Sequence, residues 1–494
     1  MRTAGTRRPD SWVSPCTFVV DSATCLRQNQ YGNSYTSVVT SLLFSRALTP
    51  NGWCDDVRVE ISGQGMIRSL EPGCRDAALP VIGGVAIPGV PNAHSHAHQR
   101  LLAGLAETGA GRDSFTRWRE LMYRIVGRID PDRFQAVASL AYMEMLKSGY
   151  TSVAEFHYLH HDAGGSPYAQ PAEMGLRCIA AAEDAGIALT LLPSLYAHGG
   201  FGPAPAGAGQ TRFVCDAGGY MEIFSALAKA VEDRPEVRLG FAPHSLRAVD
   251  EPLLKEVLAG VRQADPHAPV HMHVAEQRSE VDDCLAWCGA TPVRRLLDGI
   301  AVDARWNLVH ATHMSDSERS ALAATQASVV LCPTTEANLG DGTFPARKWL
   351  DLEGRFSIGS DSQITISPTD ELRLLEYAQR LASESRNVLA DESGESLGRV
   401  LLEGALKGGA LALAQRCGVL EEGARADIVV LDGEHPALIA RDGDEVLDSW
   451  IFAGGAACVR DVFVGGRQVV SGGRHVNEPE IVARYREAAR ALLQ

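Results

Sequence analysis

The alternation of apolar and polar residues predicts a long central region in which strands and helices take turns. Eight apolar runs read as strands: Val85–His96, Thr151–Tyr158, Ala188–Tyr196, Arg238–Leu246, Pro269–Glu276, Trp306–His313, Ser328–Glu336 and Phe356–Ser362. Segments with helical periodicity separate them, such as Phe134–Ser148, Ala172–Ala185, Gly219–Glu232 and Glu251–Ala264. This order predicts an α/β fold, a (β/α)₈ TIM-type barrel whose chemistry lies at the C-terminal ends of its strands.

Short strand patterns flank this region at both ends. The first set is Leu42–Phe44, Val57–Ile61 and Met66–Leu70, and the second is Ala426–Leu431, Val446–Phe452 and Val459–Val464, with a hairpin turn at Gly465-Gly466. We expect residues 42–84 and 419–475 to pair into one discontinuous β-sandwich domain, residues 85–418 to form the barrel, and residues 476–494 to hold a C-terminal helix. Residues 1–41 are rich in Ser, Thr and Arg, and we expect a disordered extension there rather than a signal peptide.

Composition narrows the class of protein. The 494 residues exceed one typical domain, and 45% hydrophobic with 22% charged residues is ordinary for a globular protein. The net charge of -15 argues against a nucleic-acid binder, and no apolar run approaches membrane-spanning length. The eleven cysteines are scattered, which favours reduced thiols over a disulfide framework, and Cys284 and Cys288 read as packing residues.

Titratable residues recur where the predicted strands end. The first strand ends in His94 and His96, which share one side of the strand because they are two residues apart. Two such imidazoles can bind one divalent metal, although a polar strand end is the simpler interpretation of this motif alone. Later strands end in Glu155–Tyr158, His244–Arg247, His271–Glu276, His310–His313 and Ser360–Ser362. Their common placement on one barrel face favours a catalytic site.

This arrangement resembles the amidohydrolase superfamily, in its mononuclear deaminase and deiminase branch. The features shared are His-x-His after strand one, His273-x-x-Glu276 after strand five, His310 after strand six and Ser360-Asp361 after strand eight. Strands three and four lack the lysine or glutamate that bridges two metals in dinuclear members, so one metal is favoured.

Longer runs are similar to one family in that branch, the formimidoylglutamate deiminases of histidine degradation. These runs are Pro91–His96, Trp118–Arg124, Thr151–Tyr158, His244–Ala248, Val309–His313 and Cys332–Gly342. The resemblance covers residues 42 to 475. It implies a cytoplasmic, homodimeric hydrolase of C–N bonds in linear amidines, which converts N-formimino-L-glutamate to N-formyl-L-glutamate and ammonia.

The resemblance also implies one divalent metal ion per subunit. Its ligands would be His94, His96, His273 and Asp361, and this donor set makes Zn²⁺ the first choice. Asp361 would accept the proton of the attacking water, Glu276 would donate to the imino nitrogen, and His310 would orient the water and stabilise charge. For Glu276 the alternative is a carboxylate at a helix N-terminus. We expect His271, His157 and His313 to support or pack rather than to bind.

A small-molecule dicarboxylate substrate requires cations or strong donors away from the metal, and arginine suits this purpose. The resemblance assigns substrate binding to Gln99, Arg119, Tyr158, His244 and Arg247. For Arg119 the alternative is an ion pair with Glu120 or Glu155.

Two positions depart from the family pattern, and two other functions stay open. His98 stands where we expect an apolar or aromatic residue, and Gln363 stands where we expect a histidine. The chain could instead deaminate another amidine or an aminated ring such as guanine or a triazine, but those substrates leave both arginines unexplained. A scaffold barrel without catalysis is the third option, and the intact ligand set argues against it.

Overall fold

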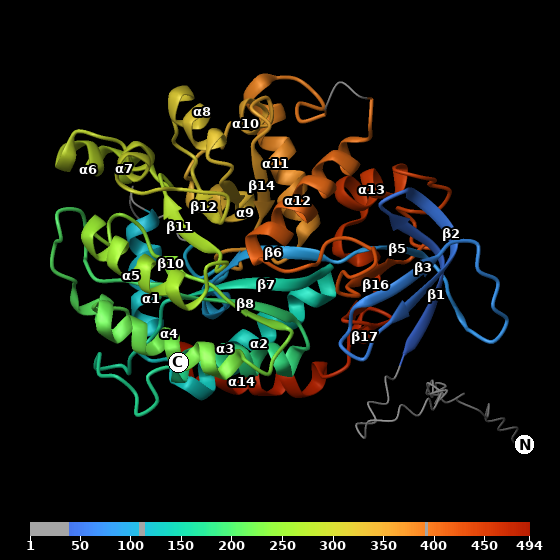
Figure 1. Cartoon of the computed structure of the whole chain (residues 1–494), viewed down its shortest axis with the longest axis horizontal. Coiled ribbons are helices and arrows are strands. Elements are labelled where there is room, and N and C mark those ends of the chain that lie inside the picture. Colours follow the sequence, from blue (N-terminus) through green and yellow to red (C-terminus); the bar gives the residue numbers. More distant parts are fainter. Residues whose placement is uncertain (1–38, 108–113, 391–393) are drawn as a thin grey trace, which may run out of the picture.

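Eight parallel strand positions close into a barrel in the computed structural model, which describes residues 39–107, 114–390 and 394–494 (Figure 1). The strands are β6 (Val90–Ser95), β7 (Tyr150–His157), β8 (Ala188–Leu195), β9 (Val237–Leu239) continued by β10 (Ala242–Pro243), β11 (Val270–Val274), β12 (Trp306–His310), β13 (Ser328–Leu331) and β14 (Arg355–Ile358). Two bridges, Phe241 to Val270 and Ser95 to Asp361, join the two halves of the barrel. The predicted TIM-type barrel is confirmed.

Helices cover the outside of the barrel. They are α1 (Ser114–Val126), α2 (Pro131–Ser148), α3 (Glu173–Ala185), α4 (Ala217–Val231), α5 (Glu251–Ala264), α6 (Arg278–Cys288), α7 (Pro292–Gly299), α8 (Asp316–Ala324), α9 (Pro333–Leu339), α10 (Ala346–Leu350), α11 (Pro368–Ser383) and α12 (Leu397–Leu413). Local signals fix their starts, as in α5, where the Asp250 side chain accepts a hydrogen bond from the Leu253 N–H at 2.9 Å. The four predicted helical segments match α2, α3, α4 and α5 to within three residues at either end.

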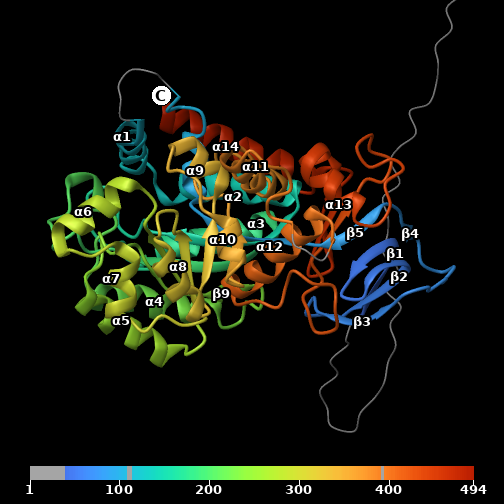
Figure 2. The ribbon, with the colours of Figure 1, turned by 90° about the horizontal axis from the view of Figure 1, so that it is seen from above.

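Both ends of the chain contribute to a second, nine-stranded sheet beside the barrel (Figures 1 and 2). Its order is β18 (Arg474–His475), β17 (Arg467–Ser471), β16 (Val459–Val464), β15 (Ile428–Leu431), β5 (Val85–Pro88), β1 (Thr40–Thr49), β2 (Gly52–Ile61) and β3 (Ile67–Glu71), with β4 (Val81–Ile82) beside β1. The sheet curls until Met66 bridges to Arg425, and it encloses a core of its own around Phe44, Val59 and Phe463. The predicted pairing of the two ends agrees with this sheet, while the division into domains at the stated boundaries stays a prediction.

The first predicted barrel strand is in fact two strands. β5 pairs with β15 in the outer sheet, whereas β6 pairs with β7 in the barrel. The chain crosses between them at Gly89, where an added Cβ would clash with the Thr151 side chain. An apolar run continuous in sequence therefore hides a change of sheet.

Two further predictions are wrong in detail. The run Val446–Phe452 forms α13 (Glu445–Ser449) and a wide helical turn, Trp450–Gly454, instead of a strand. Its buried residues, Val446, Leu447, Trp450 and Ile451, have helical spacing, and short apolar runs do not distinguish the two structures. The seventh strand ends at Leu331 rather than Glu336 because α9 begins at Pro333, a residue suited to the first turn of a helix.

The C-terminal helix expected within residues 476–494 is α14 (Glu478–Leu493), which lies along α2 (Figure 2). Ile481 packs on Leu140 and Met143, and Lys147 forms an ion pair with Glu478 at 2.7 Å. The predicted extension lies outside the described residues up to residue 38, and β1 already begins at Thr40. Within the described ranges, every helix is too short or too polar to cross a lipid bilayer.

Candidate active site

Four side chains from three barrel strands converge at the mouth of the barrel. His94 lies on β6 and His96 directly follows it, His273 lies on β11, and Asp361 follows β14. The His94 Nε2 lies 3.2 Å from the His96 Nε2 and 3.1 Å from the His273 Nε2. The Asp361 Oδ1 is 3.4 Å from the Nε2 atoms of both His94 and His96. The structure thus brings together all four predicted metal ligands.

The spacing of these atoms fits one small cation. Ligand atoms around a tetrahedral zinc ion, with bonds of about 2.0–2.1 Å, lie about 3.3 Å apart. The Nδ1 of His96 meets the Phe156 carbonyl at 2.8 Å, and the Nδ1 of His273 meets the His244 carbonyl at 3.1 Å. Each Nδ1 therefore donates, and each Nε2 keeps the lone pair that a metal requires.

Burial sets the charge state that such a ligand set needs. It lowers the pKa of His94 to about 3 and also lowers the pKa values of His96 and His273, so the imidazoles are neutral near pH 7. Burial raises the pKa of the Asp361 carboxyl. Its hydrogen bond with His94 and the nearby imidazoles outweigh this effect and hold the pKa of the carboxyl below its usual value. Three neutral imidazoles and one carboxylate remain.

His310 lies among carboxylates beside this cluster. Its Nδ1 is 3.2 Å from Glu336 Oε1, and its Nε2 is 3.7 Å from Asp361 Oδ2 and 3.8 Å from Glu276 Oε1. Burial opposes the charged imidazolium, but these three carboxylates raise the pKa of His310 to about 10. His310 and Asp361 both have positive φ, 65° and 44°, a strained conformation that persists mainly where the surroundings impose it, as at functional sites.

A buried carboxylate, Glu280, holds the turn that presents Glu276. Its two oxygens accept hydrogen bonds from the N–H groups of Ala275 at 3.2 Å and Glu276 at 3.1 Å. Ala275 adopts a positive φ of 49°, which turns the chain sharply after β11. Glu276 thus points into the barrel mouth, with Arg247 Nη2 at 3.7 Å from its Oε2. The sequence pattern predicted no role for Glu280 or Glu336.

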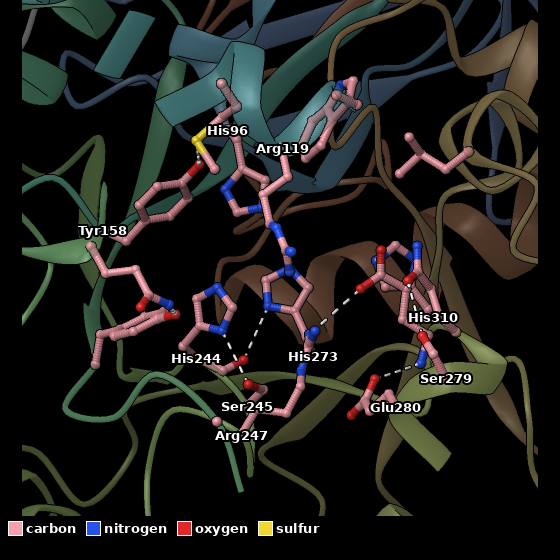
Figure 3. Close-up of a pocket in the computed structure, with 18 of the residues that line it drawn as sticks. His96, Arg119, Tyr158, His244, Ser245, Arg247, His273, Ser279, Glu280 and His310 are labelled. Atoms are coloured by element: carbon pink, nitrogen blue, oxygen red, sulfur yellow. Dashed lines mark hydrogen bonds and ion pairs between the residues drawn. The ribbon is translucent and has the colours of Figure 1, made fainter. Parts of the chain in front are cut away.

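A cavity of about 820 Å³ opens over the cluster. In Figure 3 the rings of His96, His244 and His273 lie together, with Tyr158 to one side and His310 to the other. The cavity wall includes all eight predicted catalytic and substrate-binding residues, Gln99, Arg119, Tyr158, His244, Arg247, Glu276, His310 and Asp361. It also includes residues that sequence reasoning missed, among them Trp118, Tyr123, Tyr196, Gln210 and Phe213.

The two departures from the family pattern lie at this site without entering the ligand cluster. The His98 Nε2 is 3.0 Å from the Tyr158 hydroxyl, which also accepts a hydrogen bond from Gln99 at 3.0 Å. Gln363 donates to the Ser95 hydroxyl at 3.0 Å and to the Asp361 carbonyl at 2.8 Å. Both residues therefore brace site residues.

The remaining histidines in the predicted strand ends face elsewhere. His271 donates to the Ala412 carbonyl at 2.8 Å, and His313 donates to the Asp341 carbonyl at 2.7 Å. His157 is buried, and neither ring nitrogen has a hydrogen-bond partner among the described residues. Glu155, weighed as a partner of Arg119, accepts hydrogen bonds from Ser95 and from the Ala97 N–H beneath the ligands.

Comparisons with known proteins agree with this geometry. Residues 85–469 match the amidohydrolase family, and residues 42–78 match the N-terminal domain of formimidoylglutamate deiminase HutF. A formimidoylglutamate deiminase from Pseudomonas aeruginosa is 48% identical, over 92% of this chain and 98% of that protein. The crystal structure of an amidohydrolase from Brucella melitensis is 47% identical with a TM-score of 0.86, covering 92% of this chain and 100% of that chain.

A more distant structure shares the fold. An adenosine deaminase from Xanthomonas campestris, solved with bound zinc, is 22% identical with a TM-score of 0.76 over 92% of this chain and 98% of that one. The full-length match at 48% identity, together with the matched N-terminal domain, is specific to one branch of the fold. The chain belongs to the amidohydrolase family and, within it, to the formimidoylglutamate deiminases.

Proposed function

We propose that this chain hydrolyses N-formimino-L-glutamate to N-formyl-L-glutamate and ammonia in histidine degradation. The observation that carries the proposal is the joint placement, in one cavity, of the buried His94, His96, His273 and Asp361 cluster and the guanidinium groups of Arg119 and Arg247. The similarity to the Pseudomonas aeruginosa deiminase supports the same reaction.

We propose that one zinc ion per subunit is held by the three Nε2 atoms and Asp361. The ligand spacing and neutral imidazoles support this assignment, and the distant adenosine deaminase was solved with zinc. When bound, the ion supplies Lewis-acid activation of water. Asp361 accepts the proton of the attacking water in this proposal, because its Oδ1 is the atom near His94 and His96, whereas its Oδ2 lies 3.7 Å from the His310 Nε2.

Glu276 and His310 act on the substrate in this mechanism. Glu276 donates a proton to the imino nitrogen of the amidine, which makes the amidine carbon more electrophilic. His310, held by Glu336 at Nδ1, presents Nε2 to the oxygen that joins this carbon and stabilises the charge that develops there. Asp361 passes the water proton to the same nitrogen, the bond from carbon to this nitrogen breaks, and ammonia leaves. The hydroxyl that remains on the carbon returns a proton to Glu276 as the formimino group becomes a formyl group.

The two carboxylates of the substrate need donors away from the reacting carbon. Arg247 and Arg119 supply positive charge, and Gln99, Tyr158 and His244 supply hydrogen bonds in the same cavity. Arg247 Nε, a donor, and Gln99 Oε1, an acceptor, are buried and have no hydrogen-bond partner among the described residues, so Arg247 Nε can donate to a substrate carboxylate and Gln99 Oε1 can accept from a substrate N–H. Guanine and triazines carry no carboxylate and leave these donors unmatched.

The direct test measures metal content and ammonia release together. The purified protein should contain one zinc per chain and release ammonia from N-formimino-L-glutamate but not from guanine. Ammonia release from guanine alone would overturn the proposed substrate. Zinc-free protein with full activity would overturn the proposed metal.

We also propose a homodimer located in the cytoplasm. The nine cysteines in the described ranges are all free, which suits a reducing compartment. Light scattering should give twice the mass of 52.9 kDa, and cell fractionation should recover the protein with cytoplasmic enzymes. A monomeric mass by light scattering would contradict the proposed homodimer. Recovery of the protein outside the cytoplasm would contradict the proposed location.

A further inference from the structure

A second group of ligand-type side chains adjoins the four-residue cluster. His310, Cys332 and Asp361 each offer one ligand atom, and these atoms lie within 4.8 Å of one another. Their exposed fractions are 1%, 0% and 5%, so all three are buried. They stand at or just after the ends of the neighbouring strands β12, β13 and β14. The mechanism proposed above uses no thiol.

Asp361 faces both groups with different oxygen atoms. Its Oδ1 is the atom near His94 and His96, whereas its Oδ2 lies 3.7 Å from the His310 Nε2. A carboxylate can therefore bridge two cations here, in the manner of two-metal sites whose ions are about 3.5–4 Å apart. The 3.7 Å spacing is close to the separation of about 3.3 Å expected for two ligands of one zinc ion.

A metal-binding histidine is usually held in place by a hydrogen bond to its other ring nitrogen, and His310 has such a hydrogen bond. Its Nδ1 is hydrogen-bonded to the Glu336 carboxylate at 3.2 Å, so its Nε2 is the atom that faces Asp361. Glu336 is itself fixed by the Cys332 N–H at 2.9 Å, which ties the carboxylate to the cysteine of the same group. The three candidate ligands and their supporting carboxylate thus form one connected unit.

The surroundings attract a cation, and the cavity gives it a route. Three carboxylates, Glu276, Glu336 and Asp361, lie within 3.8 Å of the His310 ring nitrogens. His310 and Asp361 both line the 820 Å³ cavity, so an ion can reach them from solvent. The thiol selects soft or borderline ions such as Zn²⁺, Cd²⁺ and Co²⁺ over Mg²⁺ and Ca²⁺.

We propose that His310, Cys332 and Asp361 form a second cation site, and that a thiophilic divalent ion bound there inhibits the enzyme. On binding, the Cys332 thiol and the protonated His310 ring each release a proton to solvent, and no electron is transferred. The ion occupies the His310 Nε2 and the Asp361 Oδ2, the two atoms that the mechanism assigns to charge stabilisation and to proton transfer. The inhibition rests on the proposed function, whereas the binding does not.

The binding test uses Co²⁺ as an absorbing probe. Protein loaded with one equivalent of zinc is titrated with Co²⁺, and thiolate-to-cobalt charge transfer is followed in the near ultraviolet. The band should appear in the wild type with a stoichiometry near one and be absent in Cys332→Ala. The matched control is Cys178→Ala, because Cys178 is an equally buried free thiol on α3, outside the group. No band in the wild type, or an unchanged band in Cys332→Ala, overturns the site.

The kinetic test follows ammonia release while Zn²⁺ or Cd²⁺ is added beyond the first equivalent. The wild type and Cys178→Ala should be inhibited, and Cys332→Ala should require at least about tenfold more metal for the same inhibition. Cys332→Ser serves if the alanine variant does not fold, because it preserves side-chain size and is a poor ligand for these ions. Equal sensitivity of Cys332 variants and wild type overturns the inhibitory role. If N-formimino-L-glutamate is not turned over at all, the proposed function fails, and the cobalt titration still decides the site.

Discussion

Replacing Arg247 by methionine tests how the enzyme grips its substrate. The Arg247 side chain is 29% exposed, and its Nη2 lies 3.7 Å from Glu276, a distance longer than a direct hydrogen bond. Its Nε has no hydrogen-bond partner among the described residues. The guanidinium therefore carries donors that are free to bind a carboxylate in the cavity. Methionine keeps much of the side-chain length and removes every donor and the charge.

The expected effect follows from the interaction that is lost. A hydrogen bond to a charged group contributes about 1.5–3 kcal/mol. Since about 1.4 kcal/mol corresponds to a tenfold change in affinity, Arg247→Met should raise KM about 10- to 100-fold. Arg247 contacts the substrate away from the reacting carbon in this account, so kcat should change much less than KM, as expected for a contact equally strong in the ground and transition states.

The assay is initial-rate ammonia release over a wide range of N-formimino-L-glutamate concentration, with zinc content measured on the same samples. The control is Arg238→Met, which removes a similarly exposed arginine from β9, at the start of the barrel strand that precedes Arg247, where it pairs with Asp265 at 2.6 Å. Zinc content should stay at one per chain in both variants. An Arg247→Met enzyme with the KM of the control would refute the assigned role, and loss of zinc would show that Arg247 acts on the metal cluster instead.

Three further predictions concern groups that support the site. Glu280→Ala should lower kcat about 10- to 100-fold, because it releases the turn that fixes Glu276. Glu280→Gln keeps one acceptor oxygen, so its kcat should lie between those of the alanine variant and the wild type. An unchanged kcat in the alanine variant would refute the role of Glu280. After dialysis, His273→Ala should lack zinc, whereas His271→Ala should retain it. His271→Ala should lose about 1–3 kcal/mol of unfolding free energy in urea, because its hydrogen bond to Ala412 is removed. The reverse zinc contents would make His271 the metal ligand and His273 the structural residue. Burial lowers the pKa of His160 to about 4 in the folded protein. As the pH falls below about 6.5, this histidine is therefore protonated in the unfolded chain before it is protonated in the folded protein. The free energy of unfolding should fall by up to about 3 kcal/mol between pH 6.5 and pH 4. His160→Gln should show a correspondingly flatter dependence of urea-unfolding free energy on pH, and an identical slope would contradict this assignment.

The barrel could be predicted from sequence because its strands are buried on both faces and its helices keep a regular apolar period. The same reasoning failed at Val446–Phe452, where a short apolar run fits a strand as well as a helix. It also failed at Gly89, where two strands of different sheets follow one another without a polar break. In both cases the deciding contacts come from distant parts of the chain, such as β15 beside β5.

The ligand residues were visible because each stands where a predicted strand ends, and parallel barrel strands present those ends on one face. The supporting carboxylates were not. Glu280 acts through backbone N–H groups of a turn at Ala275 whose positive φ the sequence does not reveal. Glu336 was assigned to a strand, whereas it lies on α9, and only this placement brings its carboxylate to His310. Such contacts depend on local backbone geometry rather than on pattern.

The central claim is that three imidazoles and one carboxylate from separate strands share a single cation. The most direct measurement is anomalous diffraction at the zinc edge from crystals of protein supplied with one equivalent of zinc. One strong peak is expected within bonding distance, about 2.0–2.2 Å, of the Nε2 atoms of His94, His96 and His273 and of an Asp361 oxygen. An ion bound elsewhere, or no ion among these four residues, would contradict it.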